Sequence, residues 1–382
     1  MDLKNTVIKF PGILFMLKNE YLIIILIIGF LLRLNNFTLG IDNIGSDETV
    51  TLMISLWLLD PYHSLSETGH EMNFYYAPLV PIIYAFLFIP FFIVKLLISG
   101  FIIDTFKEDL FNNLSQLIIF LRFFNVLVST LILFVFYKLI KLISNKQIAL
   151  IGMILLSFSS IHIEIAKTIR FWNFFMLFFL LAIYFSFKLL YSDNIKNLYL
   201  AFLFMSLNFG SMYHGIIVLY PITVLCFFLK KRTRNEKKHF FYVNILLMFF
   251  MVLIYVLHPF AFERGLHIRS YLVNVHAHLS LYEKITFYPL SILSNYGLFI
   301  TLFITIGIIL TFIKGNKEIY LLLISIILYY LLLIFIANTF EERHFIPALT
   351  LLLFFCAYGL YCSYQELIKL VKYFYMSKTA LD

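Results

Sequence analysis

Residues 21–49 read YLIIILIIGFLLRLNNFTLGIDNIGSDET, an apolar run of membrane type followed closely by an acidic pair. The whole chain agrees with that run, since 62% of its 382 residues are hydrophobic, only 13% are charged and the mean hydropathy is +0.94. A soluble core does not need so much apolar surface, whereas helices that face lipid do. The sequence therefore predicts an all-α polytopic membrane protein. In such a protein, charged side chains near the membrane are costly, so we expect two adjacent carboxylates at a membrane boundary to have a specific partner or function.

Ten apolar segments are predicted to cross the membrane. They lie at 21–34, 117–142, 148–166, 172–190, 198–213, 215–229, 241–256, 289–312, 320–336 and 345–364. Cytoplasmic loops carry an excess of lysine and arginine, and the strongest such marker is 230–238, with six basic residues. Counting spans from this marker places both termini in the cytoplasm. The chain is then one membrane domain, 1–382, with a first outer loop at 35–116 that holds juxtamembrane helices and a large outer loop at 259–288.

The apolar stretch 74–103 fits this count only if it begins and ends on the outer side. Pro81 and Pro90 interrupt it, and the loop 104–109 that follows is acidic rather than basic. Proline removes a backbone donor and kinks a helix, so we expect an interfacial or re-entrant element here. A crossing by this segment stays open as the alternative.

The acidic pair opens a predicted amphipathic helix. Ser46 can cap this helix, and Asp47 and Glu48 fall in its first turn. Asp47, Thr51 and Ser55 recur at every fourth residue and share one face. The residues free to face lipid are Met53, Ile54, Trp57 and Leu58. We expect the helix to lie in the interface and to hold Asp47 within reach of a lipid headgroup.

Arginine is concentrated on the predicted outer face, which receives six of the eight arginines in the chain. They are Arg33, Arg122, Arg170, Arg264, Arg269 and Arg343. The net charge of +8 is dispersed among apolar runs, so topology explains it better than a nucleic-acid partner does. Arginine offers a planar fork of donors that suits phosphate oxygens. For any single arginine, snorkelling to the interface is the simpler alternative.

Polar clusters gather on the same predicted face. Besides the acidic pair, they occupy 68–78, 159–172, 211–215, 258–284 and 341–347. In 159–172, helical spacing predicts that His162, Ala166 and Arg170 share a face. His276 and His278 lack a third ligand at defined spacing, so no metal site is predicted, although a divalent ion stays open. One wet, outward-facing cavity accounts for all these clusters.

With these residues placed, the chain resembles the GT-C type membrane glycosyltransferases that use a polyprenyl-phosphate sugar donor, such as protein O-mannosyltransferases and lipid A aminoarabinose transferases. The family's Asp-Glu pair corresponds to Asp47-Glu48. Its later motifs are echoed, in order, by His70 to Leu79, by Leu121 to Val126, by Ser159 to Arg170, by Met212 to Gly215 and by Arg343 to Ala348. The acid that usually precedes the family's arginine in the outer turn is absent here, where Lys167-Thr168-Ile169-Arg170 stands.

The resemblance implies an inverting transfer of a sugar to an acceptor hydroxyl at the outer face of the plasma membrane. One carboxylate base and one or two arginines suffice for it. Asp47 is the expected base, and Glu48 is expected to orient the acceptor or an adjacent group. The donor phosphate is assigned to Arg170, Arg343 and Lys167, with help from Arg264 and Arg269. The expected substrate contacts are His70, Tyr76, His162 and His214. The acceptor is a lipid, a glycan or a protein, and no cofactor is predicted. A transporter or lipid-linked glycan flippase is the alternative, and it predicts functional charges at mid-bilayer.

Overall fold

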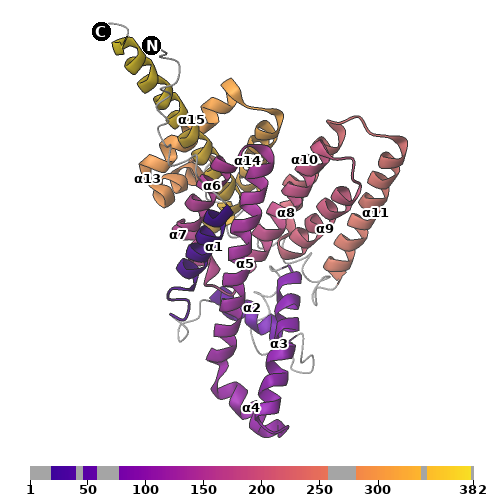
Figure 1. The fold of residues 1–382 in the computed structure, drawn as a ribbon. Helices are drawn as coiled ribbons and strands as arrows, with labels where there is room; N and C mark the ends of the chain where they lie inside the picture. The colour runs from indigo at the N-terminus through magenta and orange to yellow at the C-terminus, as the bar shows by residue number, and fades with distance from the viewer. Residues whose placement is uncertain (1–18, 40–45, 58–76, 257–280, 337–341, 380–382) are drawn as a thin grey trace.

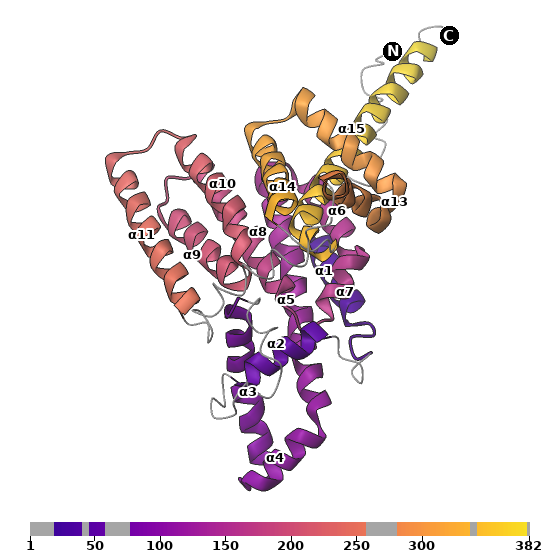
Figure 2. The same ribbon diagram turned by 180° about the vertical axis from the view of Figure 1, so that it is seen from behind.

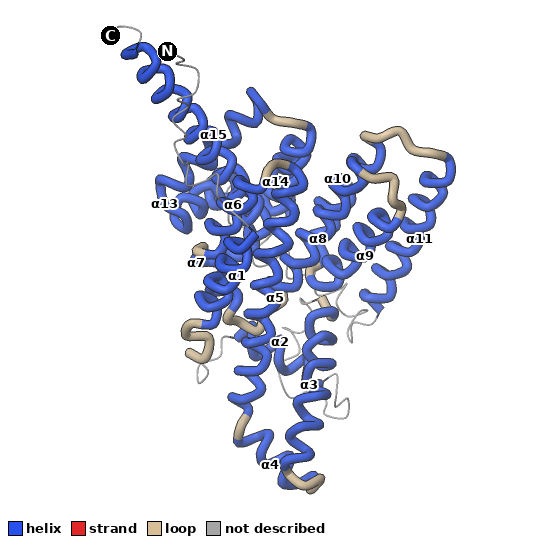
Figure 3. Tube along the Cα trace, viewed as in Figure 1, coloured by secondary structure: helices blue, strands red, loops and turns tan. Residues whose placement is uncertain are grey.

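The structure is a computed structural model that describes residues 19–39, 46–57, 77–256, 281–336 and 342–379. All regular structure in these ranges is helical (Figure 3). The helices in the first half of the chain are α1 (Asn19–Leu34), α2 (Ser46–Trp57), α3 (Leu79–Ile98), α4 (Ile103–Asn112), α5 (Leu114–Ile143), α6 (Lys146–Ser157), α7 (Ser160–Ala166) and α8 (Trp172–Tyr191). Those that follow are α9 (Lys196–Ser211), η5 (Tyr213–Gly215), α10 (Ile216–Phe228), α11 (Arg234–Val256), α13 (Leu281–Lys314), α14 (Lys317–Ile336), η6 (Glu342–Phe345) and α15 (Ile346–Thr379).

The all-α membrane class is confirmed, and a helix occupies each of the ten predicted spans. In the described ranges seven helices are long and apolar enough to cross a membrane, and the bent pair α6 and α7 makes an eighth if it is one span. The helices α1, α9 and α10 are shorter, at 16, 16 and 13 residues. The axes of α6 and α7 differ by 63°, so the predicted segment 148–166 is two helices rather than one.

The helices form a long bundle around α5 and α8 (Figures 1 and 2). On one flank α9, α10 and α11 stand together, and on the other α13 and α14 pack against α15, which packs against α6. The helices α3 and α4 and the first turns of α5 form an arm that extends away from the rest. The core is apolar and aromatic, with Trp172, Phe136, Phe175 and Phe179 almost completely buried. The arm and the C-terminal end of α15 lie at opposite ends of the molecule (Figures 1 and 2).

The arm corrects one prediction. The segment 74–103 was expected to be broken by its prolines, but α3 is one helix of 20 residues that continues through Pro90. Pro81 lies in the first turn, where the missing N–H would have had no partner in the helix. By length and composition α3 is one of the seven helices able to span. The interfacial placement of this segment stays a prediction.

The second correction concerns α2. Thr51 and Ser55 were expected on an exposed polar face, but their residues are only 2% and 0% exposed. Ile54 was expected to face lipid and is buried as well, whereas Met53 is 44% exposed. The Ser55 hydroxyl donates to the Thr51 carbonyl at 2.6 Å, so this hydroxyl is buried with its hydrogen bond satisfied within the helix. α2 therefore packs against α3 with its hydroxyl face inward.

Candidate functional site

A buried ion pair joins Glu48, in the first turn of α2, to Arg122 on α5. The Arg122 guanidinium on α5 donates from Nη2 to Glu48 Oε2 at 2.9 Å and from Nε to Glu48 Oε1 at 3.3 Å. Both side chains are only 5% exposed. Arg122 Nη1 also donates to the carbonyls of Phe37 and Leu39, at 3.2 and 2.8 Å. Arg122 thus joins the chain leaving α1 to the first turn of α2.

The turn between α7 and α8, residues 167–171, is held against this pair. The backbone N–H of Ile169 donates to Glu48 Oε1 at 2.6 Å. Asn125, one turn beyond Arg122 on α5, donates its amide to the Thr168 carbonyl at 2.9 Å. Tyr84 of α3 donates to Asn125 Oδ1 at 2.9 Å. Three helices that are distant in sequence from the turn, α2, α3 and α5, therefore set its conformation.

Three of the five cations predicted to bind phosphate lie on this turn and on η6. Lys167 and Arg170 lie in the turn and Arg343 lies in η6, and all three are partly exposed. Trp172, which begins α8 directly after the turn, packs against the ring of His344, with centroids 5.3 Å apart and ring planes tilted by 48°. The turn and η6 therefore meet at the same end of the bundle.

His214 joins the same end of the bundle from η5. Its Nε2 lies 3.1 Å from the Tyr329 hydroxyl, which donates to the His344 carbonyl at 3.0 Å. Because the tyrosine hydrogen is used in that bond, His214 Nε2 carries the proton that Tyr329 accepts. The Phe175 ring lies 5.4 Å from the imidazole. A role for His214 in substrate binding stays a prediction.

His162 is placed differently from the expectation. α7 ends at Ala166 and residues 167–171 form a turn, so no continuous helical face joins His162 to Arg170. The reason is that Glu48 and Asn125 bind the backbone of this turn from outside. His162 is 6% exposed, and its ring nitrogens lie 2.8 Å from Ser159 Oγ and 2.6 Å from Thr350 Oγ1. In this structure it links α7 to α15.

Several predicted residues fall outside the described residues. The backbone of Asp47 is described in the first turn of α2, but its side chain is not. His70, Tyr76, Arg264 and Arg269 lie in ranges outside the description, as do His276 and His278. Within the described part of the chain, no group of three or more His, Cys, Asp or Glu residues is arranged to hold a metal ion.

Arg122 was predicted to lie on the outer face, but its partner Glu48 was not predicted, and neither were the contacts that Asn125 and Tyr84 make around the turn. The signal was present in the pattern, because a charged residue inside an apolar run is costly unless another group pairs with it. Asn125, three residues later, continues the same polar stripe. Which carboxylate pairs with Arg122 depends on contacts across 74 residues of sequence.

The site is thus a basic turn, residues 167–171, whose backbone is held by Glu48 and Asn125 at one end of a helical bundle. Residues 101–258 match the family model of the dolichyl-phosphate-mannose-protein mannosyltransferases. The resemblance inferred from the motifs is thereby confirmed over α4 to α11, a range that includes the 167–171 turn. The match supports a membrane glycosyltransferase of the GT-C type that is mannosyltransferase-like. A search among curated proteins found no match.

Proposed function

We propose that this multi-pass membrane protein transfers a sugar from a polyprenyl-phosphate donor to an acceptor hydroxyl, with inversion, at the outer face of the plasma membrane. The observation that carries the proposal is the meeting of Glu48, the 167–171 turn and η6 at one end of the bundle. Lys167, Arg170 and Arg343 supply positive charge there. The family match over 101–258 favours the same donor class.

The state of Glu48 argues for Asp47 as the base. Glu48 binds Arg122 through both oxygens and the Ile169 N–H through one of them. Both carboxylate oxygens are thereby occupied by donors, so neither is free to accept a proton from an acceptor hydroxyl. Asp47 is adjacent in the chain, and successive helical residues point about 100° apart. We therefore assign proton transfer to Asp47 and positioning of the turn to Glu48.

In the proposed step, the acceptor oxygen attacks the anomeric carbon from the face opposite the phosphate. The new C–O bond forms as the bond between the anomeric carbon and the phosphate oxygen breaks, and the electron pair of the broken bond leaves with the phosphate. The acceptor proton passes to Asp47. The departing phosphate needs no proton, so Arg170, Arg343 and Lys167 stabilise its growing charge. Arg264 and Arg269 are proposed to assist, and His70, Tyr76 and His214 to contact substrate.

The test is transfer by the purified full-length protein with radiolabelled polyprenyl-phosphate sugars and a panel of protein, glycan and lipid acceptors. We expect a labelled product whose anomeric configuration is opposite to that of the donor. Movement of intact labelled lipid across vesicles, with no product from any acceptor, would identify a flippase instead.

The Asp47→Asn variant tests the base. Loss of a positioned general base typically lowers turnover by about a hundredfold or more. We expect that loss with an unchanged melting temperature, because the ion pair of Glu48 remains. Wild-type turnover in Asp47→Asn would remove Asp47 from the proposed mechanism.

A further inference from the structure

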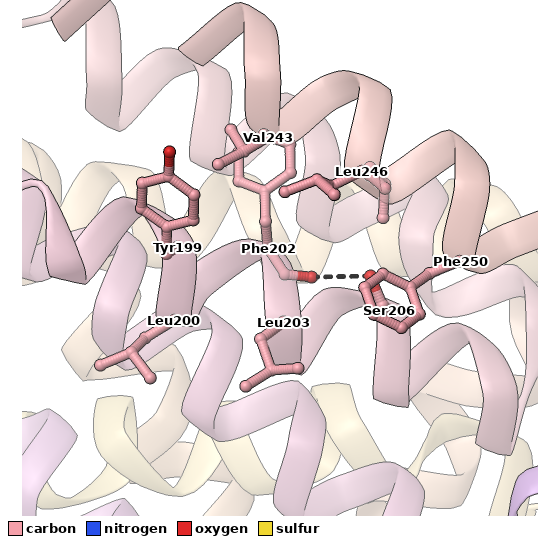
Figure 4. A pocket seen from close by; sticks show the side chains of 9 residues that line it. Tyr199, Leu200, Phe202, Leu203, Ser206, Val243, Leu246 and Phe250 are labelled. Atoms are coloured by element: carbon pink, nitrogen blue, oxygen red, sulfur yellow. Dashed lines mark hydrogen bonds between the residues drawn. The ribbon is translucent and has the colours of Figure 1, made fainter. Parts of the chain in front are cut away.

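An apolar groove of about 240 Å³ lies between α9 and α11, away from the charged turn. Its lining residues, shown in Figure 4, are Tyr199, Leu200, Phe202, Leu203, Ser206, Val243, Leu246, Leu247 and Phe250. The Ser206 hydroxyl donates to the Phe202 carbonyl at 2.9 Å, so its hydrogen-bonding hydrogen is already used within α9. The lining therefore presents hydrocarbon and aromatic surface to whatever occupies it.

The groove runs between two helices that point in the same direction. At its first end Tyr199, near the start of α9, lies 2.9 Å by its hydroxyl from His239 Nδ1, near the start of α11. At its second end lie Ser206, about two turns further along α9, and Phe250, about three turns further along α11. The groove thus has one polar end and one apolar end, as the binding site of an amphipathic molecule would.

The polar end of the groove coincides with the most basic part of the chain. Lys196 begins α9 and lies three and seven residues before Tyr199 and Leu203, so all three share one helical face. Lys196 is exposed, and among the described residues it takes part in no ion pair. The segment 230–238, with six basic residues and one acid, leads into α11 at the same end. Charge at this end favours an anionic group.

The size of the groove limits its ligand. Pockets for drug-sized molecules have volumes of about 300–1,000 Å³, so this groove suits a single hydrocarbon chain better. The exposed residues of α11 beside it, Ile245, Met248 and Phe249, are large and apolar, as expected of a surface that meets lipid. The ligand therefore reaches the groove from within the membrane.

We propose that this groove binds one acyl chain of an anionic phospholipid, with the headgroup at Lys196 and His239. The donor's polyprenyl chain is a poorer fit, because its phosphate is assigned to the opposite end of the bundle, where α9 ends and η5 begins. The site is therefore separate from the transfer reaction and does not depend on the function proposed above. The lipid fixes α11 to α9 and anchors the basic end of the protein in an anionic leaflet.

Photo-crosslinking of the full chain in phosphatidylcholine vesicles tests this site. The probes are phosphatidylglycerol and phosphatidylcholine, each with a diazirine in the middle of one acyl chain, at equal mole fraction. A basic residue near a membrane surface contributes about 1 kcal/mol of attraction to anionic lipid, so we expect about fivefold more cross-linking by phosphatidylglycerol. Mass spectrometry should locate the cross-links on the α9 and α11 peptides that line the groove.

Two variants and their matched controls decide the result. Leu203→Trp fills the groove from its exposed edge and should abolish these cross-links, whereas Ile245→Trp, on the exposed side of α11, should keep them. Lys196→Gln should reduce the preference for phosphatidylglycerol to near unity, and Lys231→Gln should leave most of it. Equal labelling by the two lipids, or labelling unaffected by Leu203→Trp, would overturn the proposal. Cross-links between the α11 helices of two molecules would overturn it in favour of a second copy of the chain.

Discussion

At the scale of single residues, the Glu48–Arg122 pair explains why an acidic pair is placed at this membrane boundary. Each side chain is 5% exposed, and each binds backbone from another segment as well as its partner. Burying two charges costs free energy that is recovered only when the geometry is good and the remaining hydrogen bonds are made. Here the additional bonds join the end of α1, the start of α2 and the 167–171 turn. The Glu48–Arg122 pair therefore holds these three segments in place around the proposed site.

Glu48→Gln and Arg122→Met should each destabilise the protein by about 3–5 kcal/mol, because each leaves an uncompensated buried charge. The double variant should be more stable than either single variant, since it removes both charges. Thermal unfolding in detergent measures stability, and transfer assays run in parallel should show that activity follows it. Two independent, additive losses would contradict this role of the pair.

Arg170→Lys tests the proposed phosphate contact. Lysine cannot reproduce the bidentate fork of arginine, so we expect both a higher donor KM and a lower turnover, because charge on the leaving phosphate grows toward the transition state. Glu48 and Asn125 hold the backbone of the turn, so its conformation should survive. Arg343→Lys should show a milder defect. Normal kinetics in both Arg170→Lys and Arg170→Ala would leave Arg170 as an interfacial anchor.

At the scale of elements, two glycines allow α13 and α15 to approach closely. A Cβ added at Gly307 would lie 1.9 Å from the Phe355 carbonyl oxygen, and one at Gly359 would lie 2.4 Å from that of Phe303. Both neighbours are backbone atoms that no rotamer change can move away. Small residues at such crossings are typical of helix pairs in membranes, where close van der Waals contact drives association.

Gly307→Ala should therefore force the two helices apart and destabilise the protein by about 1–3 kcal/mol, the usual cost of overpacking. Leu302→Ala, at an exposed position on the same helix, is the control and should have little effect on the melting temperature. A Gly307→Ala protein that melts with the wild type would show that α13 and α15 separate without cost.

At the scale of the whole molecule, the membrane topology depends on which side of the bilayer the arm of α3 and α4 lies. α5 has 30 residues and is about 45 Å long, which exceeds the roughly 30 Å hydrocarbon core of a bilayer. Its first turns pack against α3, as the contact between the Phe91 and Phe120 rings shows, with centroids 5.5 Å apart. This extra length is consistent with an arm on the outer side of the membrane.

In a cysteine-free background, a cysteine at Glu108 on α4 should react with an impermeant thiol reagent added from outside, whereas one at Asn235 should not. Both positions are exposed in the structure, so reactivity reports sidedness. Protection of position 108 until the membrane is permeabilised would mean that α3 crosses the bilayer. Reaction at position 235 in intact cells would reverse the orientation predicted from the basic residues.

The sequence by itself determined the all-α membrane class, the position of each apolar helix and the family resemblance, because hydropathy and motif order are local properties that can be read along the chain. It also indicated that Glu48, Arg170, His214 and Arg343 belong to one end of the bundle. Tertiary structure alone decided that Glu48 pairs with Arg122, that His162 binds Thr350 and that α2 buries its hydroxyl face. A buried polar group needs a hydrogen-bond partner, and the packing of the helices determines which side chain from a distant part of the sequence is close enough to be that partner. Local sequence patterns do not contain this information.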